Sequence, residues 1–303
     1  MNASIDVIKK LLFWPKIKRR LIIRKHRAVS RFCRKLISDY ESKPESHYLV
    51  TPLKNLNSDK IIWQYWGQGF NNEMPELVRK CLDSVEKNHG EATIIRLSDE
   101  TISEYLEIPD FVLEKKGLYP KAIFSDLLRC MLLSAYGGCW LDATVLLSEK
   151  IPQKYWDADF FLFQRYESET NKKYWSNAFY YYFGWENGFS VRVLNSIIFS
   201  QKNNPAITAI TQLLLHFWNQ HDNLPDYFFF QILFNELVKE GRIGNCEIEN
   251  DCIPHLLQQY INDPDFKLAS LNDILSVTPF HKLTYKSTES QNKAIAIIDH
   301  ITE

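Results

Sequence analysis

The sequence lacks a long apolar run, a secretion signal and a disulfide framework. No stretch of the 303 residues reaches the roughly 18–20 uninterrupted apolar residues of a membrane span. The N-terminus has neither the single apolar block nor the small-residue cleavage site of a signal peptide. The six cysteines form no C-x-x-C pair, which is typical of proteins in a reducing cytosol. We therefore expect the chain to stay in the cytoplasm.

The overall net charge of −1 combines two parts of opposite sign. Residues 1–37 contain twelve basic residues and one acidic residue, a net charge of +11, which leaves −12 for residues 38–303. Residues 5–37 interleave the basic side chains with aliphatic and aromatic ones, and Pro15 is expected to divide them into two helical pieces. The two parts of the chain are therefore predicted to have different partners.

We interpret residues 1–37 as a basic amphipathic arm that lies on an anionic membrane surface. Its apolar side chains would enter the headgroup boundary, and its Lys and Arg side chains would attract lipid phosphate. One alternative is a solvated helix packed on the domain that follows. Another is a nucleic-acid-binding arm, which we rank lower because no nucleic-acid motif accompanies the segment. We expect no nucleic-acid partner and a peripheral location on the cytoplasmic face of the membrane.

The rest of the chain is predicted to form one domain. A chain of this length, with 45% hydrophobic residues, can bury one large core. We divide the sequence into an arm and linker, residues 1–57, and a domain, residues 58–303. From Lys60 the predicted order is strand, helix, strand, helix, helix, strand, which indicates an α/β fold with a largely parallel sheet.

The stretch 121–147 is predicted to be the centre of that domain. Apolar residues cover most of a helical circumference from Lys121 onwards, which is typical of a buried helix. Gly137 and Gly138 are expected to end this helix. Apolar residues then alternate from Cys139 to Leu147, so we predict one continuous strand there.

Three charged residues of this stretch are candidates for a site. Asp126 and Arg129 lie three residues apart and share one helix face, where each can neutralise the other's charge. Asp142 and Thr144 share one face of the predicted strand. The other interpretation is a structural ion pair for Asp126 and Arg129, and a carboxylate bonded to backbone N–H groups for Asp142.

The patterns S-D-x-x-R at 125–129 and G-G-x-x-x-D at 137–142 resemble the core of a GT-A glycosyltransferase. The nearest group joins family 32 transferases, the large clostridial glucosylating toxins and the bacterial capsular polysaccharide synthesis proteins. The resemblance implies an α/β, Rossmann-like GT-A fold with a mostly parallel central sheet. In that group the strand usually ends in D-x-D, whose carboxylates hold a divalent metal on the donor diphosphate. Asp142-Ala143-Thr144 lacks the second carboxylate, a departure we associate with capsular synthesis members.

The resemblance also implies an activity. The protein would move a hexose, galactose or glucose, from a UDP-sugar to a lipid-linked oligosaccharide during synthesis of a capsule or other surface polysaccharide, with retention of anomeric configuration. Bound Mn²⁺ or Mg²⁺ would stabilise the departing diphosphate as a Lewis acid. The competing hypothesis is a catalytically silent nucleotide-sugar-binding scaffold, which the loss of the second carboxylate favours.

Candidate site residues follow from the resemblance and from the local pattern. The candidates for catalysis are Asp126, Arg129, Asp142 and Asp226. The candidates for donor binding are Trp63, Gln64, Trp66, Lys121, Ser125, Asp126, Arg129, Asp142 and Lys282. The candidates for metal binding are Asp142, Thr144 and His281.

Several of these candidates have a structural alternative. Trp66 stands where a predicted strand meets a glycine-flanked loop and resembles the tryptophan that stacks on uracil, although a core tryptophan is more common. Asp226 is more simply a carboxylate at a helix N-terminus than one that faces the acceptor hydroxyl. Residues 278–286 resemble the closing H-K-L-x-x-K segment of the family. There His281 would replace the missing metal ligand or bond the diphosphate, while Lys282 and Lys286 would neutralise phosphate.

Overall fold

The computed structural model describes residues 2–43, 47–71 and 73–302, and the side chains of residues 2–14 and 302 lie outside the description. The strand order of its six-stranded main sheet is β2-β1-β3-β6-β5-β7, and β4 and β8 form a second, two-stranded sheet. The strands are β1 (Ile61–Tyr65), β2 (Thr93–Leu97), β3 (Gly138–Leu141), β4 (Val145–Leu147), β5 (Phe160–Gln164), β6 (Val193–Ser200), β7 (Glu247–Asn250) and β8 (Phe280–Lys282).

The main sheet confirms the predicted α/β architecture. Strand β1 pairs in parallel with both β2 and β3, and β5 pairs in parallel with β7. Only β6 runs against its neighbours β3 and β5. Three of the five pairings in the main sheet are therefore parallel, and the sheet is mostly parallel as expected.

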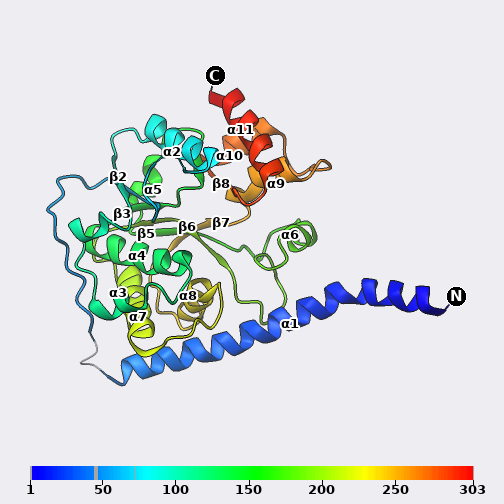
Figure 1. The fold of residues 1–303 in the computed structure, drawn as a ribbon, viewed down its shortest axis with the longest axis horizontal. Coiled ribbons are helices and arrows are strands. Elements are labelled where there is room, and N and C mark those ends of the chain that lie inside the picture. Colours follow the sequence, from blue (N-terminus) through cyan, green and yellow to red (C-terminus); the bar gives the residue numbers. More distant parts are fainter. Residues whose placement is uncertain (1, 44–46, 72, 303) are drawn as a thin grey trace.

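Helices cover both faces of the main sheet. Figure 1 shows α4, α7 and α8 on one face, and α2 and α5 on the other. Alternating residues of β1 enter the two cores, because Trp63 packs with α4 and α7 residues while Ile62 packs with the opposite cluster. The helices after the first are α2 (Glu76–Asn88), α3 (Asp110–Lys115), α4 (Lys121–Tyr136), α5 (Gln153–Asp157), α6 (Lys172–Ala178), α7 (Pro205–Gln220), α8 (Phe229–Lys239), α9 (Leu256–Asn262), α10 (Leu271–Val277) and α11 (Thr288–Thr302).

The central stretch begins as predicted and then departs from the prediction. Helix α4 is buried over most of its length, and Gly137 and Gly138 end it with φ angles of 75° and 95°. A Cβ on Gly138 would lie 2.5 Å from the Ile61 carbonyl oxygen, so a side chain does not fit there. The prediction of one strand to Leu147 is wrong. The chain turns after Leu141, and β3 and β4 belong to different sheets.

The N-terminal segment is one helix, α1 (Asn2–Glu41), which continues through Pro15. The expected division into two pieces at Pro15 is therefore wrong, and the helix extends four residues beyond the predicted arm. Figure 1 shows α1 along the outside of α7 and α8. Of the apolar residues assigned to the arm, Leu11, Leu12, Phe13 and Trp14 have side chains outside the described residues.

One side of α1 is part of the fold. Val29, Cys33, Leu36 and Ile37 are buried in the core that also contains α4, α7 and α8. Arg34 forms a 2.6 Å ion pair with Glu236 of α8. On this side, residues 29–37 therefore pack on the domain, as in the alternative of a helix packed on the domain that follows. None of the helices in the described part of the chain combines the length and apolar character needed to cross a membrane.

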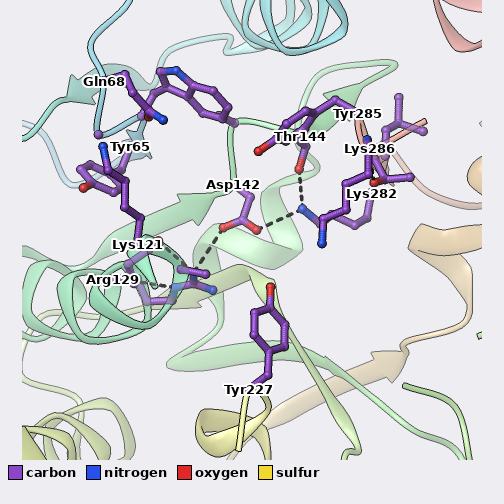
Figure 2. Close-up of a pocket in the computed structure, with 17 residues that line it drawn as sticks. Tyr65, Gln68, Lys121, Arg129, Asp142, Thr144, Tyr227, Lys282, Tyr285 and Lys286 are labelled. Carbon is purple, nitrogen blue, oxygen red and sulfur yellow. Dashed lines mark hydrogen bonds and ion pairs between the residues drawn. The ribbon is translucent and has the colours of Figure 1, made fainter. Parts of the chain in front are cut away.

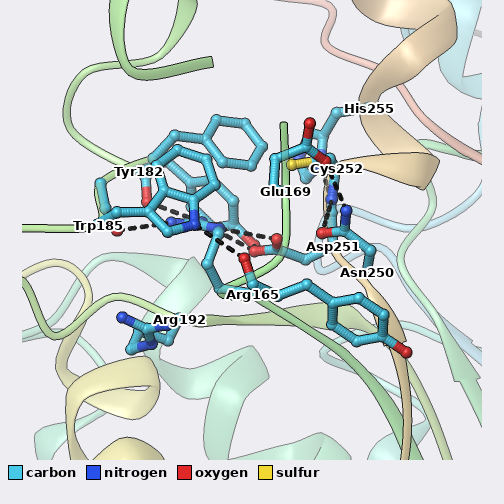
Figure 3. A network of polar contacts seen from close by, with 12 residues as sticks. Arg165, Glu169, Tyr182, Trp185, Arg192, Asn250, Asp251, Cys252 and His255 are labelled. Atoms are coloured by element: carbon cyan, nitrogen blue, oxygen red, sulfur yellow. Dashed lines mark hydrogen bonds and ion pairs between the residues drawn. The ribbon is translucent and has the colours of Figure 1, made fainter. Parts of the chain in front are cut away.

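A buried polar network fixes the segment that follows β5 (Figure 3). Arg165 donates two 2.8 Å hydrogen bonds to Asp251, and both side chains are fully buried. Arg165 also donates to the carbonyl oxygens of Tyr182 and Gly184. Such a pair is strongly destabilising to break because the remaining charge stays buried. The network therefore holds residues 182–184 in place. Within this segment, the Phe183 carbonyl accepts a hydrogen bond from Arg19 of α1.

Candidate active site

A cavity of about 380 Å³ opens where β1 and β3 end (Figure 2). Strand ends of an open α/β sheet are the usual place for a ligand. The cavity is bounded by the loop after β1, the first turns of α4, the turn after β3, Tyr227 shortly before α8, and the chain from β8 onwards. Its lining residues are Tyr65, Trp66, Gly67, Gln68, Lys121, Ala122, Ser125, Arg129, Asp142, Ala143, Thr144, Tyr227, Lys282, Leu283, Thr284, Tyr285 and Lys286.

Asp142 is the central carboxylate of the cavity. Its Oδ1 accepts a 2.8 Å hydrogen bond from Trp140 Nε1 and lies 3.5 Å from Arg129 Nη2. Its Oδ2 lies 3.1 Å from Lys282 Nζ. Burial alone would raise the pKa of Asp142, but Lys282 and Arg129 outweigh burial and hold this pKa well below its usual range. Asp142 therefore remains a carboxylate across the physiological pH range.

Asp126 and Arg129 form the predicted pair on α4. Arg129 Nη2 lies 3.1 Å from Asp126 Oδ1, and both residues are buried. Asn195 of β6 donates a 2.7 Å hydrogen bond to the same Asp126 oxygen. Burial raises the pKa of Asp126 to about 7, and Arg129 offsets only part of this effect. Arg129 itself lines the cavity, whereas Asp126 does not.

Lys282 lies between Asp142 and Thr144, two of the three side chains predicted to bind metal. Its ammonium group donates to Asp142 Oδ2 and to Thr144 Oγ1 (Figure 2). The pairing of β4 with β8 brings it there, since Val145 lies opposite Lys282 and the Leu283 amide donates to the Thr144 carbonyl. Among the described residues, no cluster of three His, Cys, Asp or Glu side chains could hold a metal ion.

His281 lies away from the cavity, on the other side of β8. Its side chain is fully buried, and its Nε2 shares a 3.0 Å hydrogen bond with Ser148 Oγ. Neighbouring residues of a strand point to opposite faces, so β8 cannot direct both His281 and Lys282 towards Asp142. Burial lowers the pKa of His281 to about 4. The structure therefore does not join His281 to Asp142 and Thr144 in one ligand set.

The candidates at the end of β1 separate into two groups. Trp66 lines the cavity and packs edge-on against Tyr285, with ring centroids 5.7 Å apart. Trp63 and Gln64 are fully buried outside the cavity. Trp63 donates a 2.9 Å hydrogen bond to the Gly137 carbonyl and so supports the glycine turn. Of this group, only Trp66 is positioned to contact a ligand.

Asp226 is a buried carboxylate beside the cavity. Its Oδ1 accepts a 2.7 Å hydrogen bond from the Phe228 amide, just before α8. Its Oδ2 lies 2.6 Å from Lys25 Nζ of α1. Asp226 does not line the cavity, but the next residue, Tyr227, does and points its hydroxyl into it (Figure 2). These contacts support the helix N-terminal role of Asp226.

Three residues at or beside this site, Asn195, Tyr227 and Tyr285, are not among the sequence candidates. Asn195 lies in the otherwise largely apolar strand β6, and its side-chain amide donates a hydrogen bond to Asp126. Tyr227 and Tyr285 add aromatic surface to the lining of the cavity. Only Asn195 carried a signal in the sequence, as a polar residue in an apolar strand. Lys121 and Ser125, two of the donor-binding candidates, line the cavity.

The sequence of the chain matches a known protein family. Residues 13–301 match the family described as capsular polysaccharide synthesis protein, and the chain belongs to that family. The chain is 25% identical over 177 residues to an O-glycosyltransferase, PaGT, from Phomopsis amygdali, a match that covers 55% of this chain. It spans 40% of the length of that relative. The solved structure of the PaToxG glycosyltransferase aligns with 92% of this chain and 98% of its own, at 15% identity and a TM-score of 0.35.

Proposed function

We propose that the protein is a glycosyltransferase that moves a hexose from a UDP-sugar to a glycan acceptor in the synthesis of a capsule or another surface polysaccharide. Membership of the capsular polysaccharide synthesis family supports the process, and the similarity to an O-glycosyltransferase supports the reaction class. The observation that carries the proposal is Asp142, held by Arg129 and Lys282 at the end of β3 and facing a ligand-sized cavity.

The lining of the cavity fits the parts of a nucleotide sugar. Trp66 and Tyr285 offer ring faces and edges to a planar base. Lys282, with Lys121 and Lys286 at the rim, offers positive charge to a diphosphate. Arg129 and the carboxylate of Asp142 offer a donor and an acceptor to sugar hydroxyls. The lining of the cavity thus combines aromatic surface with charged groups around Asp142.

The reaction would break the bond between the sugar C1 and the diphosphate oxygen, with the electron pair left on the diphosphate. The acceptor hydroxyl oxygen forms the new bond to C1, and its proton passes to the departing diphosphate. Fixed positive charge next to the diphosphate lowers the barrier because negative charge develops there. Similarity to family 32 transferases and the clostridial toxins supports retention, with galactose or glucose as the hexose. NMR analysis of the product anomer tests the stereochemistry.

A screen of nucleotide sugars for thermal stabilisation tests donor binding, because a ligand that binds the native state raises its apparent stability. Donor hydrolysis by an Asp142→Asn variant then tests catalysis. We expect hydrolysis to fall by about 100-fold or more, with the fold intact. Asp159→Asn, an exposed carboxylate on another loop, is the matched control. Unchanged turnover in Asp142→Asn would remove Asp142 from the site.

The same assays separate the enzyme from a catalytically silent scaffold. The scaffold hypothesis draws on the missing second carboxylate, with Thr144 in its place. It predicts that UDP-sugars bind while neither hydrolysis nor transfer occurs with any metal. The enzyme hypothesis predicts slow hydrolysis of one UDP-hexose even without acceptor, since water can take the place of the acceptor hydroxyl.

We further propose that α1 holds the enzyme on the cytoplasmic face of an anionic membrane, near a lipid-linked oligosaccharide acceptor. The outer side of α1 carries exposed Arg20, Arg24 and Arg31, which form no ion pair within the described part of the chain. Ile17 and Leu21, 44% and 55% exposed, lie beside them. Positive and apolar groups together suit a lipid headgroup region. Packing of α1 on α7 and α8 would hold the catalytic domain at the membrane surface.

A further inference from the structure

The ammonium group of Lys282 lies in the place where a second metal-binding group is expected. In a D-x-D transferase the two carboxylates close around a divalent ion, and here the second position is Thr144. Lys282 Nζ contacts both Asp142 Oδ2, at 3.1 Å, and the Thr144 hydroxyl. The pairing of β4 with β8 fixes Lys282 opposite Val145, next to Thr144. The position of this cation is therefore set by the backbone of a sheet.

The donor set does not fit a divalent ion. Mg²⁺ and Mn²⁺ prefer oxygen ligands with negative charge, and among the described residues Asp142 is the one carboxylate that lines the cavity. Both of its oxygens already have partners, Oδ1 with Trp140 and Arg129, and Oδ2 with Lys282. Thr144 offers only a neutral hydroxyl. His281 is buried against Ser148 on the other side of β8.

The charges of the site also oppose a divalent ion. Arg129 and Lys282 are both within 3.5 Å of Asp142, so an ion at this carboxylate would meet two like charges. The same two cations would attract a diphosphate. A lysine ammonium is a compact point charge suited to phosphate oxygens, and it is already in position before the donor binds.

We propose that Lys282 replaces the divalent metal in this protein, so that donor binding and glycosyl transfer proceed without a metal ion. The proposal depends on the proposed glycosyltransferase function and gives Lys282 a specific role within it. The ammonium of Lys282 neutralises the diphosphate as the C1–oxygen bond breaks, while Asp142 and Thr144 hold the ammonium in place. The expected Mn²⁺ or Mg²⁺ cofactor is then unnecessary.

The first test compares the purified full-length chain in EDTA and in Mn²⁺. We expect the UDP affinity measured by calorimetry, and the rate of UDP-hexose hydrolysis, to agree within about twofold between the two conditions. A UDP affinity or a rate that rises about tenfold or more with Mn²⁺ would overturn the metal-independent role of Lys282. If no UDP-sugar is bound or hydrolysed in either condition, the glycosyltransferase proposal itself fails, and this inference fails with it.

The second test removes the charge of Lys282 by substitution. Lys282→Met keeps the length of the side chain and removes its charge, and we expect about a 100-fold loss of hydrolysis that Mn²⁺ does not restore. Lys150→Met, at an exposed lysine before α5, is the control and should leave hydrolysis unchanged. Full restoration of Lys282→Met by Mn²⁺ would contradict the proposal.

The combination of Thr144→Asp with Lys282→Met rebuilds a D-x-D motif without the competing cation. We expect this double variant to bind Mn²⁺ in electron paramagnetic resonance titrations at concentrations where the wild-type chain shows no binding. Its hydrolysis activity should depend on Mn²⁺. Equal Mn²⁺ binding by the wild-type chain would show that Lys282 does not exclude the metal, and would overturn the inference.

Discussion

Lys25 of α1 and Asp226, the residue before Tyr227, form a 2.6 Å ion pair that joins the N-terminal helix to the edge of the cavity. Asp226 is 7% exposed and also accepts the Phe228 amide, so it fixes the turn that places Tyr227. Lys25 remains 59% exposed. The turn at Asp226 therefore links α1 to Tyr227 of the cavity.

This relationship predicts a structural rather than a catalytic role for Asp226. Asp226→Ala should lower the free energy of unfolding by about 1–3 kcal/mol, because a buried amide loses its acceptor. Lys25→Ala should lower it by a similar amount, because the buried Asp226 carboxylate then loses its cation. Urea denaturation measures both. Asp226→Asn keeps an acceptor, so its kcat should stay within a few-fold of wild type. A loss of about 100-fold in kcat, with stability preserved, would favour the acceptor-facing role.

The raised pKa of Asp126 predicts that the stability of the fold depends on pH. Burial raises its pKa to about 7, above the value of an exposed aspartate, so the folded state binds a proton that the unfolded chain releases between about pH 4 and 7. The contribution of Asp126 to stability is therefore greatest at low pH and is lost as the pH rises through 7. Asp126→Asn should flatten the pH profile of unfolding and raise stability at pH 8. Asp110→Asn, an exposed control in α3, should leave the profile unchanged. Parallel curves for Asp126→Asn and wild type would contradict this account.

Trp63 and Trp66 predict different effects on UDP binding. Trp66→Ala should weaken UDP binding by about tenfold, because it removes an aromatic face from the cavity, and it should also lower stability, because the half-buried ring packs against a buried cluster that includes Met74 and Val78. Trp63→Phe should lower the free energy of unfolding by about 1–3 kcal/mol, because the Gly137 carbonyl loses its buried donor, and UDP affinity should stay the same. Calorimetry and urea denaturation of both variants check the pair. If Trp63→Phe weakens UDP binding as much as Trp66→Ala, the assignment of the two roles is incorrect.

The exposed side of α1 predicts charge-dependent binding to vesicles. Reversal of Arg20, Arg24 and Arg31 to Glu should weaken the affinity for phosphatidylglycerol vesicles by at least about 100-fold, because each lost basic charge removes about 1 kcal/mol of binding free energy. Sedimentation with the vesicles measures this affinity. Binding of the wild-type chain should also weaken in high salt. Reversal of Lys150, Lys202 and Lys267, exposed residues of other elements, is the matched control and should leave sedimentation unchanged. Equal sedimentation of the two triple variants would count against the membrane proposal.

The sequence predicted the elements whose signals are local. The apolar circumference of α4 and the glycine pair after it determine that helix and its end, and they brought Asp126, Arg129 and Asp142 into one hypothesis. The break between β3 and β4 was not predictable from alternation. Ala143 is buried like the strand residues around it, so the apolar pattern continues through the turn.

Contacts between distant parts of the chain were the least predictable. The role of Lys282 depends on the register of β4 with β8, and that same register turns His281 away from Asp142. Nothing in the local pattern of residues 278–286 decides which of the two faces the cavity. Likewise, the contact of Lys25 with Asp226 spans about two hundred residues and follows from the packing of α1 on α8. Pairings of this kind are a property of the tertiary structure.

The most direct test of the central claim is a crystal structure of the full-length protein with UDP bound. The account predicts uracil against Trp66 and Tyr285, and the diphosphate in contact with Lys282 next to Asp142. UDP bound outside this cavity, or a protein that does not bind UDP at concentrations that saturate known transferases, would contradict the claim.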